Sequence, residues 1–288
     1  MKKKAITILA ALIFVAGLGV MLYPTISDLW NSFRSTRRIQ DYTAAVSGIS
    51  EEEYNRLYLA AERFNQRIPE RANPYVLPEE DVAEYNSLLN IGGNGIMGYI
   101  EVPSIKVALP ICHGTAEDVL QTAIGHMEQS SLPVGGASTH CVLSGHRGLP
   151  SAKLFTDLDR VAVGDRFMLY ILNEVLTYEV DQILTVLPDE SQALQIIPGE
   201  DYCTLVTCTP YGINTHRLLV RGHRVETVAE AEAERPVTAE PSTVSFLSQL
   251  PPAAIPLAVG LTAVGLTAGL LAGGRHKKRG KNNKDHTE

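Results

Sequence analysis

A cysteine and an arginine nine residues apart are the first candidates for chemistry in this chain of 288 residues. Cys208 ends the alternating, β-branched run 204–208, and Arg217 lies in a second short apolar run, 215–220. Both runs have the composition of β-strands. Neighbouring strands of one sheet can hold a thiolate close to a cation. The pair therefore predicts a site for nucleophilic chemistry at a cysteine.

A cysteine nucleophile needs a base to take its proton, so a histidine should lie within reach. His146 follows a predicted strand in the segment 144–150, where glycines allow a tight turn and side chains can project into a cleft. His216 precedes Arg217 on one strand, so their side chains point to opposite faces. For any histidine taken alone, a structural hydrogen-bonding role is the alternative. The others before the C-terminal tail are His113, His126, His140 and His223.

The remaining cysteines leave other interpretations open. Cys203 and Cys208 are five positions apart on one strand, so they face opposite sides and cannot bridge each other. Buried free thiols are the default for Cys112, Cys141 and Cys203, and Cys112 and Cys141 could form a disulfide only if their strands are neighbours. A zinc site would require a CxxC or HxxxH spacing, which the sequence lacks, so we expect no metal or cofactor. The candidate ligands of such a zinc site are Cys141, His146, Cys208 and His216.

Uncharged apolar stretches near both ends of the chain are long enough to cross a bilayer, which requires roughly 20 residues. The first, 5–23, follows three lysines, and the second, about 253–274, precedes a basic tail at 275–288. By the positive-inside rule, both termini are cytoplasmic and the domain between the spans is extracellular. Residues 21–24 offer no small-x-small cleavage site, so we interpret the first span as an anchor rather than a cleaved signal peptide.

The part of the chain between the basic ends is strongly acidic. The whole chain has 25 basic and 32 acidic residues, and nine of the basic but only two of the acidic residues lie at the two ends. The remainder has 16 basic against 30 acidic residues, a net charge of −14. Contacts with phosphate need clustered Lys and Arg, so this composition argues against nucleic acid as a partner.

Composition divides the chain into six segments. The region after the first span is helical in its periodicity, the next is rich in short strands and turns, and the third is rich in Ala, Glu, Pro and Ser, as in a flexible tether. In order, the segments are the cytoplasmic tip and first span (1–25), the helical region (26–94), the β-rich region (95–226), the tether (227–252), the second span (253–274) and the basic tail (275–288).

The helical region contains one clear amphipathic helix and one loop. Ser50 and Glu53 have the spacing of a capping box, and apolar residues then recur at three- and four-residue steps through 54–64. The segment 71–78 breaks this pattern, because each of its prolines pushes the preceding residue into an extended conformation. A loop with one aromatic residue at its tip is expected there, followed by a short helix over 80–89.

The β-rich region predicts a mainly β fold. At least seven short strands in roughly 130 residues, with small helices near 116–122 and 154–158, favour one closed or nearly closed barrel. The predicted strands are 98–102, 107–111, 141–144, 166–170, 176–180, 202–208 and 217–221.

These motifs together resemble the sortases, membrane-anchored cysteine transpeptidases of Gram-positive bacteria. The run 204–208 matches the TLxTC signature of that family, Arg217 lies where its essential arginine falls, and His146 occupies the place of its catalytic histidine. The resemblance covers 73–225 and is greatest to class C, the pilus-assembling sortases, because of the run after the arginine and the second span. Other ordered matches are 114–115, 125–126, 132–136, 145–150, 153–158 and 209–211.

The resemblance implies a fold, a reaction and a set of partners. The fold would be a closed eight-stranded β-barrel, and the partners would be the membrane and pilin subunits bearing LPXTG-like sorting signals. Cys208 would attack the Thr–Gly bond of the signal, and His146 would protonate the leaving amine and later deprotonate a lysine of the next pilin. Arg217 would bind the substrate backbone and stabilise the oxyanion.

One motif departs from the class C pattern. The lid of these enzymes usually has Asp-Pro and an aromatic residue at its tip, where this chain reads Asn73-Pro74-Tyr75. Asparagine can hydrogen-bond Arg217 but forms no ion pair, so a closed lid is expected to be held less tightly, by about 1 kcal/mol. Tyr75 can still cover the Cys208 thiol. We hypothesise that this loop gates the site.

Two other functions stay open at this point. A housekeeping sortase would join surface proteins to cell-wall peptide, although the lid-like segment and the second span argue against it. A non-enzymatic surface protein would use 250–254 as a sorting signal before the second span, but that segment lacks the threonine and glycine of such a signal. A plain stop-transfer anchor explains the second span better.

Overall fold

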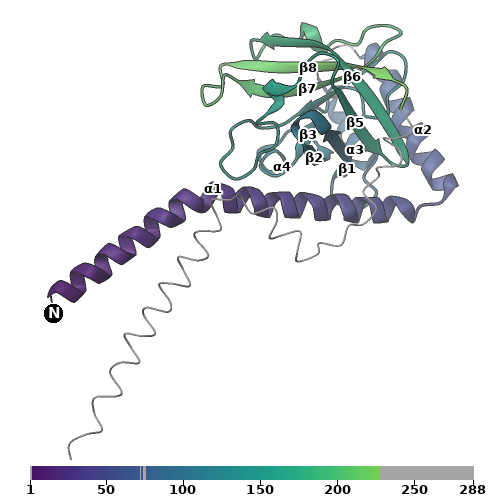
Figure 1. Ribbon diagram of the computed structural model, residues 1–288. Helices are drawn as coiled ribbons and strands as arrows, with labels where there is room; N and C mark the ends of the chain where they lie inside the picture. The colour runs from purple at the N-terminus through teal and green to yellow at the C-terminus, as the bar shows by residue number, and fades with distance from the viewer. Residues whose placement is uncertain (1, 72, 74–75, 228–288) are drawn as a thin grey trace, which may run out of the picture. The chain divides into compact units, whose positions relative to one another are not determined.

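The computed structural model describes residues 2–71, 73 and 76–227 (Figure 1). Pro74 and Tyr75, at the tip of the predicted lid, lie outside the described residues. The predicted second span, the basic tail and all but the first residue of the tether also lie outside them.

A single long helix begins the chain. Helix α1 (Lys2–Ser47) is unbroken even at Pro24, so the boundary placed at residue 25 falls inside one helix. Its segment from Leu9 is long and apolar enough to cross a membrane, and it is the one such helix among the described residues. An apolar N-terminal helix of this kind can serve as the membrane anchor.

The C-terminal half of α1 packs against the barrel, while its N-terminal half projects beyond it (Figure 1). Ile39, Tyr42 and Val46 are buried against strands of the barrel. The Tyr42 hydroxyl donates to the Met97 carbonyl at 3.0 Å and accepts from the Leu172 backbone N–H at 2.7 Å. Both bonds are buried, so Tyr42 joins the helix to two separate strand ends.

The rest of the helical region follows the predicted pattern. Helix α2 (Glu51–Arg67) is capped by Ser50, whose hydroxyl accepts from the Glu53 N–H at 3.2 Å. The helix buries Ala61 and Phe64. The Glu53 carboxylate pairs with Arg56 instead of completing a capping box. The 3-10 helix η1 (Ile68–Glu70) and helix α3 (Glu79–Ser87) stand on either side of the predicted lid loop.

Eight strands close into a barrel, which confirms the predicted mainly β fold. The order around the barrel is β1-β2-β3-β4-β7-β8-β6-β5, and β5 closes the ring by pairing with β1. Most pairs are antiparallel, but β2–β3 and β4–β7 are parallel. The strands are β1 (Ile96–Val102), β2 (Val107–His113), β3 (Ile124–His126), β4 (Thr139–Ser144), β5 (Arg166–Ile171), β6 (Glu174–Val186), β7 (Asp201–Thr209) and β8 (His216–Val225).

Three local predictions differ from the structure. Strand β3 was not predicted, because three residues are too short to show a strand period. Strand β6 extends to Val186 through a register irregularity between Val180 and Gln182, which disrupts the alternation beyond 180. The helix expected at 154–158 is a series of turns that ends in the 3-10 helix η3 (Leu158–Arg160). The apolar residues of 154–158 are buried in turns, so their spacing reflects packing on the core and not a helical period. The other short helices are η2 (Pro103–Ile105), α4 (Glu117–Leu120) and η4 (Gln192–Leu194).

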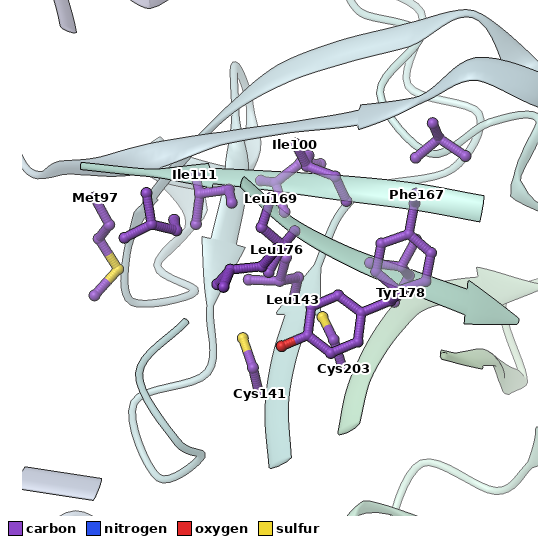
Figure 2. Close-up of a cluster of buried hydrophobic side chains, with 14 of the residues drawn as sticks. Met97, Ile100, Ile111, Cys141, Leu143, Phe167, Leu169, Leu176, Tyr178 and Cys203 are labelled. Atoms are coloured by element: carbon purple, nitrogen blue, oxygen red, sulfur yellow. The ribbon is translucent and has the colours of Figure 1, made fainter. Parts of the chain in front are cut away.

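The barrel interior is filled by side chains from all parts of the sheet (Figure 2). Cys141 on β4 and Cys203 on β7 are register partners, and both are buried there. The sequence did not predict this contact, because it arises from a parallel pairing of strands that are far apart in the chain. A smaller apolar cluster, made of Val142, Val206 and Leu219, lies on the other face of β4, β7 and the neighbouring strand β8.

Candidate active site

Cys208 and Arg217 are direct partners in the antiparallel pairing of β7 with β8. Side chains of such partners leave the sheet on the same face. The same register pairs Val206 with Leu219, two positions further into the sheet. The thiol and the guanidinium therefore lie on the outer face of the barrel, where β7 ends and β8 begins, beyond the apolar cluster that contains Val206 and Leu219. This rim of the barrel is called the edge below.

His146 reaches this edge from the neighbouring strand on the other side of β7. Ser144, at the end of β4, is the parallel partner of Val206. The pairing continues beyond the strand, because the Gly145 N–H donates to the Val206 carbonyl at 3.0 Å and the buried Thr207 hydroxyl donates to the Gly145 carbonyl at 2.7 Å. A register continued by two more residues would set His146 beside Cys208 on the same face.

The turn after β4 depends on glycine at one position in particular. A Cβ atom at Gly145 would lie 2.6 Å from Ile124 Cδ1 and 2.7 Å from Phe155 Cδ2. These distances are too short for any side chain, so only glycine lets the chain leave β4 over the end of the core. The buried Phe155 also donates its backbone N–H to the His146 carbonyl at 3.1 Å, which fixes the backbone of that histidine.

Arg217 has its hydrogen-bond partners in its own turn. One terminal nitrogen donates to the carbonyls of Asn214 and His216, at 3.3 and 3.1 Å. Within residues 2–71, 73 and 76–227, no carboxylate forms an ion pair with Arg217. Its positive charge is thus available to a ligand at the edge beside Cys208.

The outer face beside these residues is covered by the segment between β6 and β7. Ala193 and Leu194 of η4 pack on the apolar cluster. His140 fixes the end of this segment, since its Nδ1 lies 2.9 Å from the Gln195 carbonyl and its Nε2 lies 2.7 Å from the Thr204 hydroxyl. Burial lowers the pKa of His140, so the ring is neutral, donating from Nδ1 and accepting at Nε2.

Comparisons with known proteins agree with this arrangement. The sortase-domain family model matches residues 100–225. Sortase A of Bacillus anthracis is 24% identical over 80% of this chain and 99% of its own length. The sortase C1 crystal structure from Streptococcus agalactiae is 53% identical, with a TM-score of 0.65 over 67% of this chain and all of that chain. The chain belongs to the class C sortases. Sortase C of Streptococcus pneumoniae is also similar, at 42% identity and a TM-score of 0.61 over 66% of this chain and 97% of its own.

Sortases are cysteine transpeptidases, so membership in the family makes this chain an enzyme of that type. Cys208 and Arg217 are register partners on β7 and β8, and His146 follows the neighbouring strand β4 by two residues. Their joint catalytic use stays a prediction. Asn73 is exposed and its carbonyl accepts from the Val76 N–H at 3.3 Å. The other two residues of the predicted lid tip lie outside the described part of the chain.

Two other histidines of the sortase are held by hydrogen bonds, and a third faces away from the site. The ring of His113 lies between the carbonyls of Gly95 and Leu88 and in its neutral form donates to one of them, while His126 lies beside the Tyr85 hydroxyl and the Ser131 carbonyl. His216 pairs with Thr209, so it faces away from Arg217 as the alternation predicted.

The cysteines of the sortase are all free, so the expected free thiols are present and the alternative disulfide between Cys112 and Cys141 is not. These two cannot meet, because β3 separates β2 from β4 in the barrel. Cys208 is half-buried, whereas the other three are buried. In the part of the chain with described coordinates, no three His, Cys, Asp or Glu side chains are grouped as they would be around a metal ion.

Sequence reasoning missed one prominent group at this edge. Arg147, directly after His146, extends its guanidinium to the Thr209 hydroxyl and to the Asp159 carboxylate. The sequence does not predict these contacts, because Thr209 and Asp159 come to Arg147 from two distant segments of the chain.

Proposed function

We propose that this sortase cleaves an LPXTG-like sorting signal of a pilin between threonine and glycine and joins the threonine to a lysine of the next pilin. The observation that carries this proposal is the pairing of Cys208 with Arg217 on one outer edge of the barrel, with His146 brought there by the β4–β7 register. Two similar structures support the substrate class. The structure of the S. pneumoniae enzyme concerns pilin substrate specificity, and another is of Clostridium perfringens sortase C with the C-terminal cell wall sorting motif.

In this proposal Cys208 and His146 perform the covalent steps. The Cys208 sulfur attacks the threonine carbonyl carbon, the C–N bond to glycine breaks, and His146 gives a proton to the departing amine. A thioester remains on Cys208. His146 then takes a proton from the incoming lysine amine, which attacks the same carbon. The C–S bond breaks to give an isopeptide bond and the Cys208 thiolate, which takes the proton back from His146 to restore the free thiol.

Arg217 stabilises the negative oxygen that forms in both tetrahedral intermediates. A fixed cation acts more strongly on such charge in a water-poor cleft than in solvent. The guanidinium is held by two backbone carbonyls and no described carboxylate competes for it, which leaves its charge for the substrate. It also has the donors to bind the backbone of the sorting signal.

We further propose that the segment with Asn73, Pro74 and Tyr75 forms a lid over this edge. The neighbouring helices η1 and α3 fix its two ends. The test compares alkylation of Cys208 by a small thiol reagent in the wild type and in Tyr75→Ala. Faster alkylation in the variant is expected, and equal rates would count against gating.

The proposed location follows from the anchor helix. With the first span in the membrane and the second span at 253–274, both termini would be cytoplasmic and the barrel extracellular, where pilins are assembled. Protease added to intact cells should then remove the barrel, while a tag at either terminus stays protected.

The identity of the accepted amine separates this function from that of a housekeeping sortase. Cells that express the wild type and a pilin should produce a covalent ladder of pilin multimers, and Cys208→Ala should abolish it. Mass spectrometry of the joined peptide should find a pilin lysine in the new bond. A cell-wall peptide amine at that position would assign the housekeeping reaction instead.

A further inference from the structure

Arg147 sits between the two segments that carry the proposed nucleophile and proton carrier. It follows His146 in the chain, and its Nη1 donates to the hydroxyl of Thr209, which follows Cys208, at 3.2 Å. Its Nη2 pairs with the carboxylate of Asp159 in η3, at the end of the loop that His146 begins. The guanidinium of Arg147 thus contacts both the end of β7, which carries Cys208, and the far end of the loop that begins at His146.

The burial of this side chain argues for a demanding role. Only 9% of the Arg147 side chain is exposed, although Asp159 is 44% exposed. The Arg147 Nε is buried and has no hydrogen-bond partner among the described residues. Burying a guanidinium with an unsatisfied donor costs free energy, so other contacts of the fold must offset the cost of holding it there. A surface ion pair alone would not require that burial.

The ring of Tyr211 adds a third contact from the turn between β7 and β8. The Arg147 Cζ lies 5.9 Å from the centre of this ring, within the range of a cation–π interaction. Gly148 has a φ of +74°, which favours glycine, and a Cβ atom there would lie 2.9 Å from Tyr211 Cε2, so any other residue would displace the ring. The His146 loop and the β7–β8 turn are therefore in tight contact around Arg147.

We propose that Arg147 is a positioning residue that fixes the distance and orientation of His146 relative to Cys208. This inference rests on the proposed roles of those two residues. The contact with Thr209 ties the loop to the end of β7, and the ion pair with Asp159 restrains the other end of the loop. Removing the guanidinium would leave the nucleophile and proton carrier present but less well aligned, and misplacement of about 1 Å can lower rates about 100-fold.

The test uses the full-length protein in detergent with a fluorogenic Leu-Pro-x-Thr-Gly peptide. Arg147→Ala is expected to lower kcat about 10- to 100-fold while KM changes less than about twofold. Arg147→Lys keeps the charge but not the fork that reaches two partners, so it should restore only part of the rate. Thr209→Val removes the hydroxyl acceptor at nearly constant shape and should reproduce part of the loss.

A second readout separates positioning from a purely structural role. The rate at which iodoacetamide alkylates Cys208 is measured across pH in each variant, since this needs no turnover. Positioning predicts a changed pH profile in Arg147→Ala and a smaller change in Thr209→Val. A lower melting temperature with kcat and the pH profile unchanged would overturn the inference, as would a rise in KM alone. The proposed function fails separately, if Cys208→Ala still cleaves the peptide.

Discussion

Cys208 and Arg217 are register partners on adjacent antiparallel strands, so a thiol and a guanidinium leave the same face of the barrel side by side. The pairing makes their relative position a property of the sheet and not of a loop. His146, the proposed proton carrier, lies two residues after β4, the strand on the other side of β7 from β8. The three groups of the proposed site therefore come from β7, β8 and the loop that follows β4.

The exposure of the four cysteines predicts how they react. In the native protein, only the half-buried Cys208 should react within minutes with a small disulfide reagent such as DTNB. After denaturation, all four thiols should react, because none is in a disulfide. Cys208→Ser should remove the native reaction completely. Two thiols after denaturation would show that the buried Cys141 and Cys203 are oxidised to a disulfide.

Arg217 should matter for the chemical step more than for folding. Arg217→Ala is expected to lower kcat by about 100- to 1,000-fold, as for the loss of one oxyanion donor, with little change in melting temperature. Arg217→Lys should retain part of the activity through its charge. The check is steady-state kinetics on a sorting-signal peptide together with thermal unfolding. Unchanged kcat with a raised KM would restrict Arg217 to substrate binding.

Tyr42 should contribute to stability through its hydroxyl. Tyr42→Phe leaves the buried Leu172 N–H and Met97 carbonyl without that partner, so the free energy of unfolding should fall by about 1–3 kcal/mol. Tyr54→Phe is the matched control, because its hydroxyl bonds Glu174 at the surface, and its effect should stay within about 0.5 kcal/mol. Denaturant titrations of both variants measure the difference. Equal effects would contradict the packing of α1 on the barrel.

Buried histidines should make stability depend on pH. Burial lowers the pKa of His140 and His113 in the folded state below the value of about 6.5 in the unfolded chain. Protons then bind the unfolded chain first, so stability should be greatest above pH 6.5 and fall below it, by at most about 1.4 kcal/mol per pH unit for each histidine.

The matched variants for this effect are His140→Gln and His216→Gln. His140→Gln should flatten the fall in stability between about pH 5 and 6.5. His216 faces away from Arg217 at the half-buried end of β8, so His216→Gln controls for the loss of a histidine outside the core. The measurement is the unfolding free energy at several pH values. A slope that does not change in His140→Gln would contradict the assignment of a buried neutral ring.

The sequence predicted the barrel and the family better than it predicted the contacts between distant segments, and the catalytic roles stay predictions. Alternating apolar runs identified most strands, and the run ending at Cys208 identified the signature of the family. Strand β3 and the adjacency of Cys141 to Cys203 depend on parallel pairings that local periodicity does not contain. The role of Arg147 was hidden for the same reason, because Asp159 and Thr209 come to it from different parts of the chain.

The most direct measurement of the central claim is the trapping of an acyl-enzyme. The full-length protein is incubated with a pilin or peptide that carries the LPXTG-like signal, quenched in acid, digested and examined by mass spectrometry. The proposed mechanism predicts the threonine acyl group in thioester linkage on the peptide that contains Cys208, sensitive to hydroxylamine and absent in Cys208→Ala. Cleavage of the signal by Cys208→Ala, or an acyl group on any other residue, would contradict it.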